Sequence, residues 1–374
     1  MPTRAVVISA TLACVGRGGA QIAREAAVMI RSLCLAAKLP LIVIGIALSA
    51  AAPAQSPEVG SRNSEPAAAA THRAAAERAA GTRWAGEYQF VCSLAPHLGN
   101  SPNDPAIEPR KIFDNVSILG DRGTVMYAIK TSRGDILIDS SYSNKTTSLV
   151  LPSLRQLGID PADVKYILVT HGHPDHFGGA QYFQSHYGTR IAASDADWNL
   201  ITSLPRPAEG AAPAAGAPEP ATPAPPPRRD VVIADGGTIR LGDTQVQAFL
   251  VPGHTPGALG FIFPVKDHGQ VRRAALFGGL ILVEGRMSNE NLRQYVQSLA
   301  HFADATRRRH VEVELENHIN FDDTLEKLRA LGSGTSGAAN PFVVGQKGYQ
   351  DFLTVLSECA QATLARRESR VGSQ

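Results

Sequence analysis

Residues 171–176 read His-Gly-His-Pro-Asp-His, which places three imidazoles and one carboxylate within six residues. Neutral imidazole and carboxylate are ligand types that zinc prefers in proteins. Neighbouring side chains in so short a segment point in different directions, so this one segment can contribute to two metal positions. The alternative interpretation is a solvated loop whose histidines occur by chance. We favour metal coordination, because donors at this density coexist most readily when metal ions hold them.

The donor segment follows an apolar run at 166–169, which predicts a buried strand with the donors on the loop after it. The same order recurs twice. A strand-like run at 246–251 leads into Pro-Gly-His-Thr-Pro-Gly at 252–257, and an alternating run at 311–315 leads to His318. His310 is the rival of His318, but it follows three arginines rather than an apolar strand. Three distant segments are therefore predicted to bring histidines to one edge of a sheet.

Strands and helices that must position these loops occur throughout the rest of the chain. Strand-like runs lie at 116–119, 125–129, 135–139, 189–193, 231–233, 239–241, 259–265 and 274–277. Helical periodicity is found at 149–157, 180–187, 289–302, 324–331 and 349–364.

The first 54 residues predict a secretory signal peptide. An apolar core at 39–48 follows Arg31 and Lys38, and small residues with an A-x-A-like cleavage site come next. Met29 could itself start such a signal, and an uncleaved membrane anchor is the alternative. Signal cleavage would leave a periplasmic or secreted protein without stable membrane insertion.

Composition divides the remainder into four parts. Residues 55–83 are rich in Ala, Ser, Pro and Glu and predict a flexible linker, with a possible helix at 67–80. The folded domain is expected at 84–366, followed by a tail at 367–374. It is interrupted at 204–229, where nine prolines in 26 residues predict an exposed insertion, either a dispensable surface loop or a lid over a site.

Composition and charge limit the class of protein. The chain has 374 residues, of which 44% are hydrophobic and 19% charged, which is typical of globular proteins. Its formal charge is only +2, and the mature part has no basic stretch that would favour nucleic acid. We also expect a monomer that acts on a small-molecule substrate.

At these residues the chain resembles the metallo-β-lactamase superfamily. The matching features are the donor segment at 171–176, the loop at 252–257, Leu-Ile-Asp at 137–139 and His318 after a strand. Within the superfamily, the phrases at 111–116, 196–198 and 340–343 are similar to the third subclass of class B. The resemblance spans about residues 110–366. It implies an α/β fold, the αββα sandwich, in which mixed sheets carry helices on their outer faces.

The resemblance also implies two zinc ions per chain and a role for each donor. A hydroxide held between two zinc ions is a nucleophile at neutral pH and would attack an amide or β-lactam carbonyl. Asp175 would be a catalytic residue that orients this hydroxide, and Asp139 would orient a ligand histidine. The implied ligands are His171, His173 and His254 for the first zinc, and Asp175, His176 and His318 for the second.

Gly279 departs from the pattern of several related hydrolases. Glyoxalase-type thioesterases and quorum-signal lactonases carry a metal-bridging aspartate where this chain has Gly279, which disfavours those families. The third β-lactamase subclass usually offers serines here to hold the substrate carboxylate, whereas this chain has Gly279 and Ile281. Ser288, Asn289 and Arg286 are candidates to replace those serines in the substrate pocket.

Three alternatives to a β-lactamase therefore stay open. The first is a zinc hydrolase of lactones, esters or thioesters. The second is a non-catalytic zinc-binding protein, which the open metal position of such a site disfavours. The third is redox chemistry on two irons, which usually needs the aspartate that Gly279 replaces.

Two cysteines, Cys92 and Cys359, remain after the predicted signal peptide. In an exported protein they could form one disulfide between the start of the folded domain and its terminal helix. A buried free thiol at Cys359 is the alternative.

Overall fold

The computed structural model describes residues 65–92, 104–204, 225–280, 287–319, 322–332 and 339–371. All of these residues belong to one compact unit, Asn63–Gln374. The predicted signal peptide, the first part of the predicted linker and residues 205–224 of the proline-rich insertion lie outside the described residues. No helix in the described ranges is both long and apolar enough to cross a membrane.

The first sheet has seven strands, which are adjacent in chain order. β1 to β4 pair antiparallel through tight turns, whereas β4 to β7 pair parallel. Parallel neighbours need a crossover connection, which explains why the predicted helices lie between these later strands. The strands are β1 (Arg110–Phe113), β2 (Val116–Gly120), β3 (Val125–Thr131), β4 (Gly134–Ile138), β5 (Val164–Leu168), β6 (Arg190–Ser194) and β7 (Val231–Ile233).

The second sheet has five strands in the order β12-β11-β10-β9-β8. Its pairs are antiparallel except for β11 and β12, which are parallel and joined through the long helix α7 (Asn289–Arg308). The strands are β8 (Thr238–Leu241), β9 (Thr244–Leu250), β10 (Leu259–Asp267), β11 (Gln270–Leu276) and β12 (Val313–Leu315).

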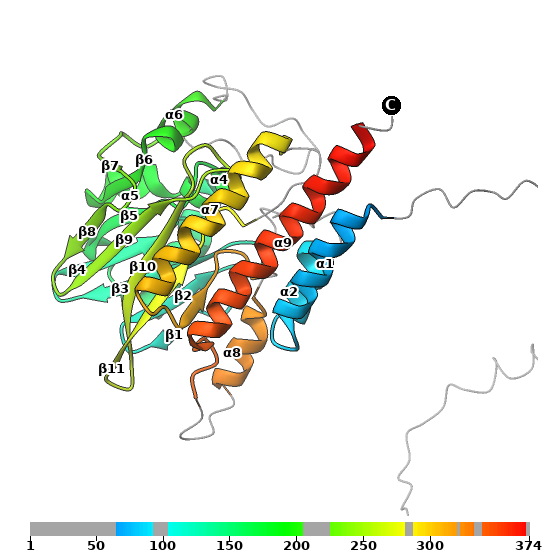
Figure 1. Ribbon diagram of the computed structural model, residues 1–374. Coiled ribbons are helices and arrows are strands. Elements are labelled where there is room, and N and C mark those ends of the chain that lie inside the picture. The colour runs from blue at the N-terminus through cyan, green and yellow to red at the C-terminus, as the bar shows by residue number, and fades with distance from the viewer. Residues whose placement is uncertain are drawn as a thin grey trace, which may run out of the picture. The chain divides into compact units, whose positions relative to one another are not determined.

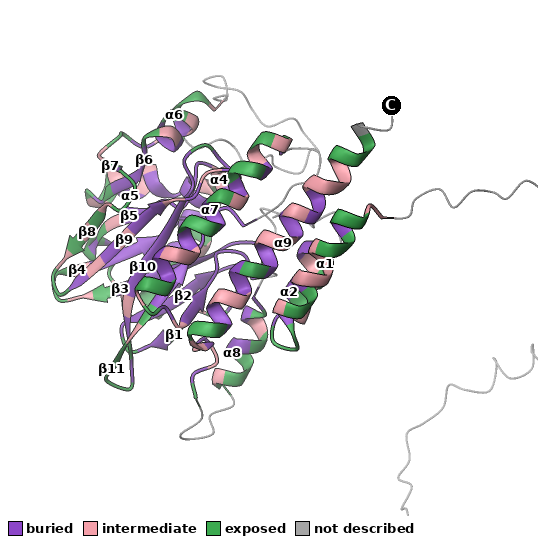
Figure 2. Cartoon of the chain, viewed as in Figure 1, coloured by how far each residue is buried: buried purple, intermediate pink, exposed green. Residues whose placement is uncertain are grey.

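Three apolar layers hold the two sheets and the helices together, as the buried residues in Figure 2 illustrate. One layer, which includes Ile118 and Phe261, fills the space between the sheets. A second packs α3 (Leu151–Gln156), α5 (Ala180–Tyr187) and α6 (Asp195–Ser203) on the first sheet. A third packs α7 and α9 (Gly345–Val371) on the second sheet (Figure 1). This is the predicted αββα sandwich with helices on the outer faces.

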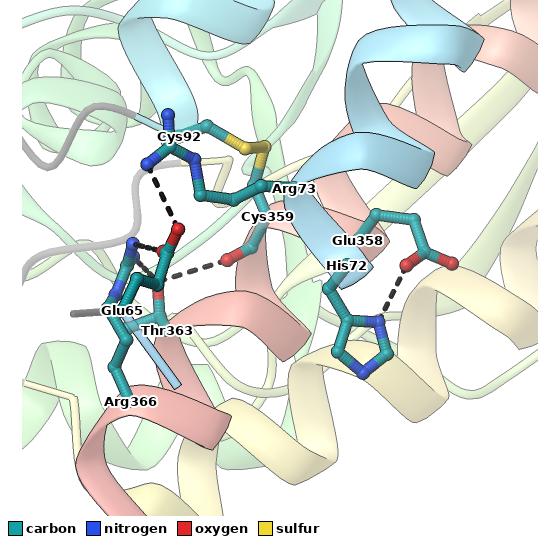
Figure 3. Close-up of a disulfide and its surroundings, with 8 residues drawn as sticks. All are labelled: Glu65, His72, Arg73, Cys92, Glu358, Cys359, Thr363 and Arg366. Carbon is teal, nitrogen blue, oxygen red and sulfur yellow. Dashed lines mark hydrogen bonds and ion pairs between the residues drawn. A yellow bond between two sulfur atoms is a disulfide. The ribbon is translucent and has the colours of Figure 1, made fainter. Parts of the chain in front are cut away.

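The start of the folded unit differs from the prediction. Residues of the expected flexible linker form α1 (Ala67–Ala80), and α2 (Ala85–Cys92) follows it. Ala69 and Ala76 are fully buried, because alanine lets α1 approach α9 closely. The Nδ1 of His72 lies 2.7 Å from the Glu358 carboxylate (Figure 3). The possible helix at 67–80 is therefore present, but it packs within the folded unit instead of lying in a flexible linker, and α9 continues beyond residue 366 to Val371.

A disulfide joins Cys92 at the end of α2 to Cys359 in α9, with 4.9 Å between their Cα atoms (Figure 3). We expect its reduction to lower the free energy of unfolding by ~2–4 kcal/mol, because the cross-link closes a long loop of the unfolded chain. Urea unfolding with and without reductant measures this difference. The matched control is the Cys92→Ser, Cys359→Ser protein, whose free energy of unfolding should be the same with and without reductant. Equal stability of the oxidised and reduced wild-type protein would contradict the prediction.

Candidate metal centre

Three strand ends bring six donor side chains together at one edge of the sandwich. β5 ends just before the segment 171–176, β9 ends just before His254, and β12 ends just before His318. The donors form two groups, in each of which the potential ligand atoms lie within 4.8 Å of one another. The first group contains His171, His173 and His254, and the second contains Asp175, His176 and His318.

The two groups lie side by side. The ring centroids of His171 and His176, one from each group, are 3.9 Å apart. Within the first group, the His254 ring is 4.7 Å from both the His171 and the His173 ring. Within the second, the His176 and His318 rings are 5.0 Å apart. The rival donor His310 lies elsewhere and contacts Gln346.

A short helix explains how one segment serves both groups. α4 (Pro174–Phe177) begins inside the donor segment, with His173 in extended backbone just before it. Proline at the first position of a helix favours a start at this point. His171 and His173 therefore come from the irregular chain before the helix, whereas Asp175 and His176 come from the helical turn. The sequence predicted only a loop here, because a single helical turn is too short to show periodicity.

Asp139 is a buried carboxylate that holds a histidine of the second group in place. It directly follows β4 and is fully buried, with a φ of 64°. Its Oδ2 accepts a hydrogen bond from His176 Nδ1 at 2.8 Å, and its Oδ1 accepts one from the Thr170 backbone N–H at 2.8 Å. Asn317 donates to the same carboxylate at 3.1 Å. Because His176 Nδ1 is held as a donor, its Nε2 is the ring atom that faces the other members of the group.

Buried imidazole nitrogens test whether these residues fit a metal. The Nε2 atoms of His171 and His176 are buried and make no hydrogen bond to protein. Asp175 Oδ2 lies 3.2 Å from the His176 Nε2. His318 donates from Nδ1 to the Gly123 carbonyl at 2.8 Å, which leaves its Nε2 as the acceptor atom. Buried nitrogens without partners are rare, and such a set of imidazoles and carboxylate suits zinc.

The charges of the protein groups favour the forms that bind metal. Burial, and then the neighbouring imidazoles, hold the pKa of His171 well below its usual value. Burial and then His176 lower the pKa of His318 to about 4. Burial opposes ionisation of Asp175, but His176 and the other histidines outweigh it and lower the pKa of its carboxyl. His171 and His318 are thus neutral and Asp175 is ionised at neutral pH.

His176 carries the positive charge of the cluster. Burial opposes that charge, but the Asp175 and Asp139 carboxylates outweigh burial and raise the pKa of His176 to about 10. A metal ion would have to displace the proton of this imidazole, so metal binding at the second group should release protons.

Asp197 is a supporting residue whose role the sequence did not reveal. It lies in the first turn of α6, and its carboxylate is buried. It accepts hydrogen bonds from the Gly172 N–H at 2.8 Å, the Thr255 hydroxyl at 2.7 Å and the Gly257 N–H at 2.8 Å. One carboxylate therefore ties the segment of His171 and His173 to the loop of His254. The only signal in the sequence was its place in the phrase at 196–198.

We expect Asp197→Ala to weaken metal binding at the first group by about 10–100-fold, because both loops lose their shared acceptor. Competition with a chromophoric chelator measures the affinity. The matched control is Asp195→Ala, since Asp195 lies in the same helical turn but is exposed and pairs with Arg229. Equal metal affinity in the two variants would contradict the role given to Asp197.

The structure describes three of the predicted pocket residues, Gly279, Ser288 and Asn289. Gly279 is buried with a φ of 79°, and a Cβ there would come within 2.8 Å of His254 Cβ. Gly279 therefore lies directly against the donor histidine His254. Ser288 caps α7 by accepting the Asn291 N–H, and the Asn289 side chain contacts Arg367. Ile281 and Arg286 lie outside the described residues.

Two further polar side chains contact the centre. Asn317 donates to the Thr170 hydroxyl at 3.1 Å as well as to Asp139. The Thr124 hydroxyl donates to Asp175 Oδ2 at 3.3 Å. Asn317 could have been suspected because it precedes His318, whereas no pattern in the sequence singles out Thr124.

The fold and the two donor groups together define the class of protein. It is an αββα sandwich that carries two adjacent groups of potential metal ligands at one edge. Residues 119–268 match the family model described as the metallo-beta-lactamase superfamily. The chain thus carries a metallo-β-lactamase superfamily domain and is a hydrolase of that superfamily. The predicted resemblance is confirmed at this level.

Known proteins similar to this chain differ in their described activities. BJP-1, a subclass B3 metallo-beta-lactamase of Bradyrhizobium japonicum, is 28% identical with a TM-score of 0.59 and covers 72% of this chain and 97% of its own. A hydroxyacylglutathione hydrolase of Acidiphilium cryptum is 29% identical over 50% of this chain and 79% of its own length. The acyl-coenzyme A thioesterase MBLAC2 of Gallus gallus is 27% identical over 57% of this chain and 78% of its own.

Proposed function

We propose that this chain is a dinuclear zinc hydrolase that opens cyclic amides of the β-lactam type. His171, His173 and His254 would hold one zinc ion, and Asp175, His176 and His318 the other. The observation that carries this assignment is the pair of adjacent donor groups, in which the buried His171 Nε2 has no hydrogen-bond partner and the buried His176 Nε2 faces the Asp175 carboxylate. Bound zinc ions supply Lewis-acid chemistry and lower the pKa of water.

The chain's own residues have separate tasks in this proposal. Asp139 accepts the His176 Nδ1 proton and so fixes the tautomer and direction of that imidazole. The Gly123 carbonyl does the same for His318. The ionised Asp175 carboxylate, which the Thr124 hydroxyl holds in place, can accept a hydrogen bond from an attacking water and orient it.

Gly279 supports an amide substrate over a thioester. The aspartate expected in thioesterase-type members cannot occupy this position, because a side chain there would meet His254. The similarity in fold to a subclass B3 enzyme agrees with this choice. Hydrolysis of thioesters, esters or lactones is the second candidate, which the similarity to a hydroxyacylglutathione hydrolase and an acyl-coenzyme A thioesterase favours.

The proposal includes export to the periplasm or the medium. The apolar run with small residues at 39–54 and the disulfide between Cys92 and Cys359 support it. A monomer that acts on small molecules, and not on nucleic acid, is in keeping with the formal charge of +2.

Turnover of defined substrates by the zinc-loaded protein tests the function. The panel contains a carbapenem, a chromogenic cephalosporin, an acylated glutathione and an acyl-coenzyme A, each measured with and without chelator and after zinc is restored. Chelator-sensitive opening of either β-lactam supports the proposal. Turnover of thioesters alone would establish the second candidate. Two bound zinc ions without turnover of any substrate would indicate a non-catalytic zinc-binding protein.

A further inference from the structure

A cavity of 720 Å³ lies on the second sheet, far from the metal-binding edge. Asp243 and Gln245 line it at the start of β9, whereas the donor loop follows the end of that strand. Ile262 packs in the apolar layer between the second sheet and the helices α7 and α9, while its neighbours Phe261 and Phe263 pack between the two sheets. The cavity, which Ile262 also lines, therefore opens on the outer face, beside the last turn of α7.

The carboxylates in the lining of this cavity already have cationic partners. Glu312 accepts from Arg272 at 3.2 Å, and Asp243 accepts from Lys266 at 3.2 Å. Arg308 is compensated as well, because it pairs with Asp304 one turn earlier in α7. Within each of these pairs the two charges cancel. The net charge of the cavity therefore comes from its remaining arginines, Arg273 and Arg309.

Arg273 and Arg309 line the same cavity without an ion pair to any described carboxylate. Neutral groups hold Arg309 in place. Its Nε donates to Gln247 Oε1 at 2.6 Å, its Nη1 donates to the Ala305 carbonyl at 3.1 Å, and its guanidinium lies 4.8 Å from the centre of the Phe249 ring. Arg273 is exposed and lies opposite Pro264 on the neighbouring strand.

Solvation alone would account for a free arginine on a sheet surface. It does not account for Arg309, because three contacts fix this long side chain without neutralising its charge. A guanidinium ordered in advance loses less conformational entropy when it binds an anion. The planar fork of donors also matches phosphate and carboxylate oxygens.

We propose that this cavity binds a small organic phosphate. Arg309 and Arg273 provide two uncompensated charges, which suit the two charges of a phosphate monoester. A volume of 720 Å³ is within the range of small-molecule sites and exceeds what inorganic phosphate fills. Ile262, Pro264 and the exposed Val271 offer apolar contact to the organic part. This site is independent of the proposed hydrolase function.

Binding is tested with phenyl phosphate and the isotope-labelled, zinc-loaded full chain, followed by NMR. Backbone amide signals of Gln247, Val271 and His310 report on the cavity, and those of Gly253 and Gly279 report on the metal-binding edge. We expect saturable shifts at the cavity. Both Arg309→Gln and Arg273→Gln should weaken this binding at least about tenfold, because each removes a charged hydrogen-bond donor.

The matched control is Arg308→Gln, which should change the affinity less than about twofold because Arg308 is paired within its helix. Arg273 is exposed, so its variant remains informative if Arg309→Gln fails to fold. Shifts confined to the metal-binding edge, or equal losses in all three variants, would overturn the proposal.

A second arm identifies the source of the phosphate. Phosphatidylcholine vesicles with and without phosphatidylglycerol are sedimented with the protein. Binding that needs phosphatidylglycerol, and is lost in the Arg273 and Arg309 variants, assigns the site to a lipid headgroup. Binding of phenyl phosphate without sedimentation assigns it to a soluble phosphate ester. No binding in either arm rejects the site.

Discussion

His176→Ala is expected to lower kcat/KM at least ~10³-fold and to reduce the zinc content from two ions per chain to one. This imidazole is fully buried between the Asp139 and Asp175 carboxylates, at 2.8 Å and 3.2 Å. Its loss removes a ligand of the second group and leaves two buried negative charges without their shared cation. Metal analysis of purified protein and initial rates on the most rapidly hydrolysed substrate measure both effects.

The control for this variant is His186→Ala. His186 is exposed on α5, where it stacks on Tyr182 with 3.8 Å between ring centroids. It should keep both zinc ions and full activity. Circular dichroism and urea unfolding of His176→Ala separate loss of the site from loss of the fold. A His176→Ala protein that retains two zinc ions and normal turnover would refute the assignment of the second group.

Gly279→Asp should lower activity about a hundredfold and should not create a thioesterase. The backbone φ of 79° disfavours any side chain, and a Cβ would lie 2.8 Å from His254 Cβ and 3.1 Å from its Cγ. Because real Cβ atoms do not approach so closely, either His254 or the Gly279 backbone must shift, and we expect His254 to move out of the first donor group. A displacement of about 1 Å at such a site can cost ~10²-fold in rate.

Gly269→Ala is the matched control for the cost of placing a side chain on left-handed backbone. Gly269 has the same φ of 79°, but a Cβ there would meet nothing within 4 Å. Both Gly269→Ala and Gly279→Ala should cost about 1–2 kcal/mol of stability from the left-handed backbone. Only the Gly279 variants should also lose zinc from the first group and activity. A Gly279→Asp protein that gains thioester hydrolysis with both zinc ions retained would show that the loop can adapt.

The sequence was sufficient to predict the donors because each histidine follows an apolar strand. The runs before 171–176, before 252–257 and before His318 required no tertiary information, and β5, β9 and β12 end as those patterns indicated. The two-sheet arrangement came from the resemblance, since strand order cannot be read from periodicity.

Other features depended on contacts between distant residues. The sequence allowed a helix at Ala67–Ala80 but not its place in the folded unit, because α9 is needed to cover Ala69 and Ala76. Asp197 looks like an ordinary residue of a helical first turn until two loops point N–H groups at it. The pairing of Cys92 with Cys359 was left open for the same reason, because their separation of 267 residues gives no local signal.

The wide spacing of the donors in the chain has a consequence for biosynthesis. A nascent chain that has reached residue 176 offers four donors, but the first group is complete only after His254 and the second only after His318. Folding of both sheets must therefore precede full metal loading. The disulfide of Cys92 can form only later still, because Cys359 lies 267 residues further along the chain. The native partner of Cys92 is therefore absent until residue 359 has been synthesised.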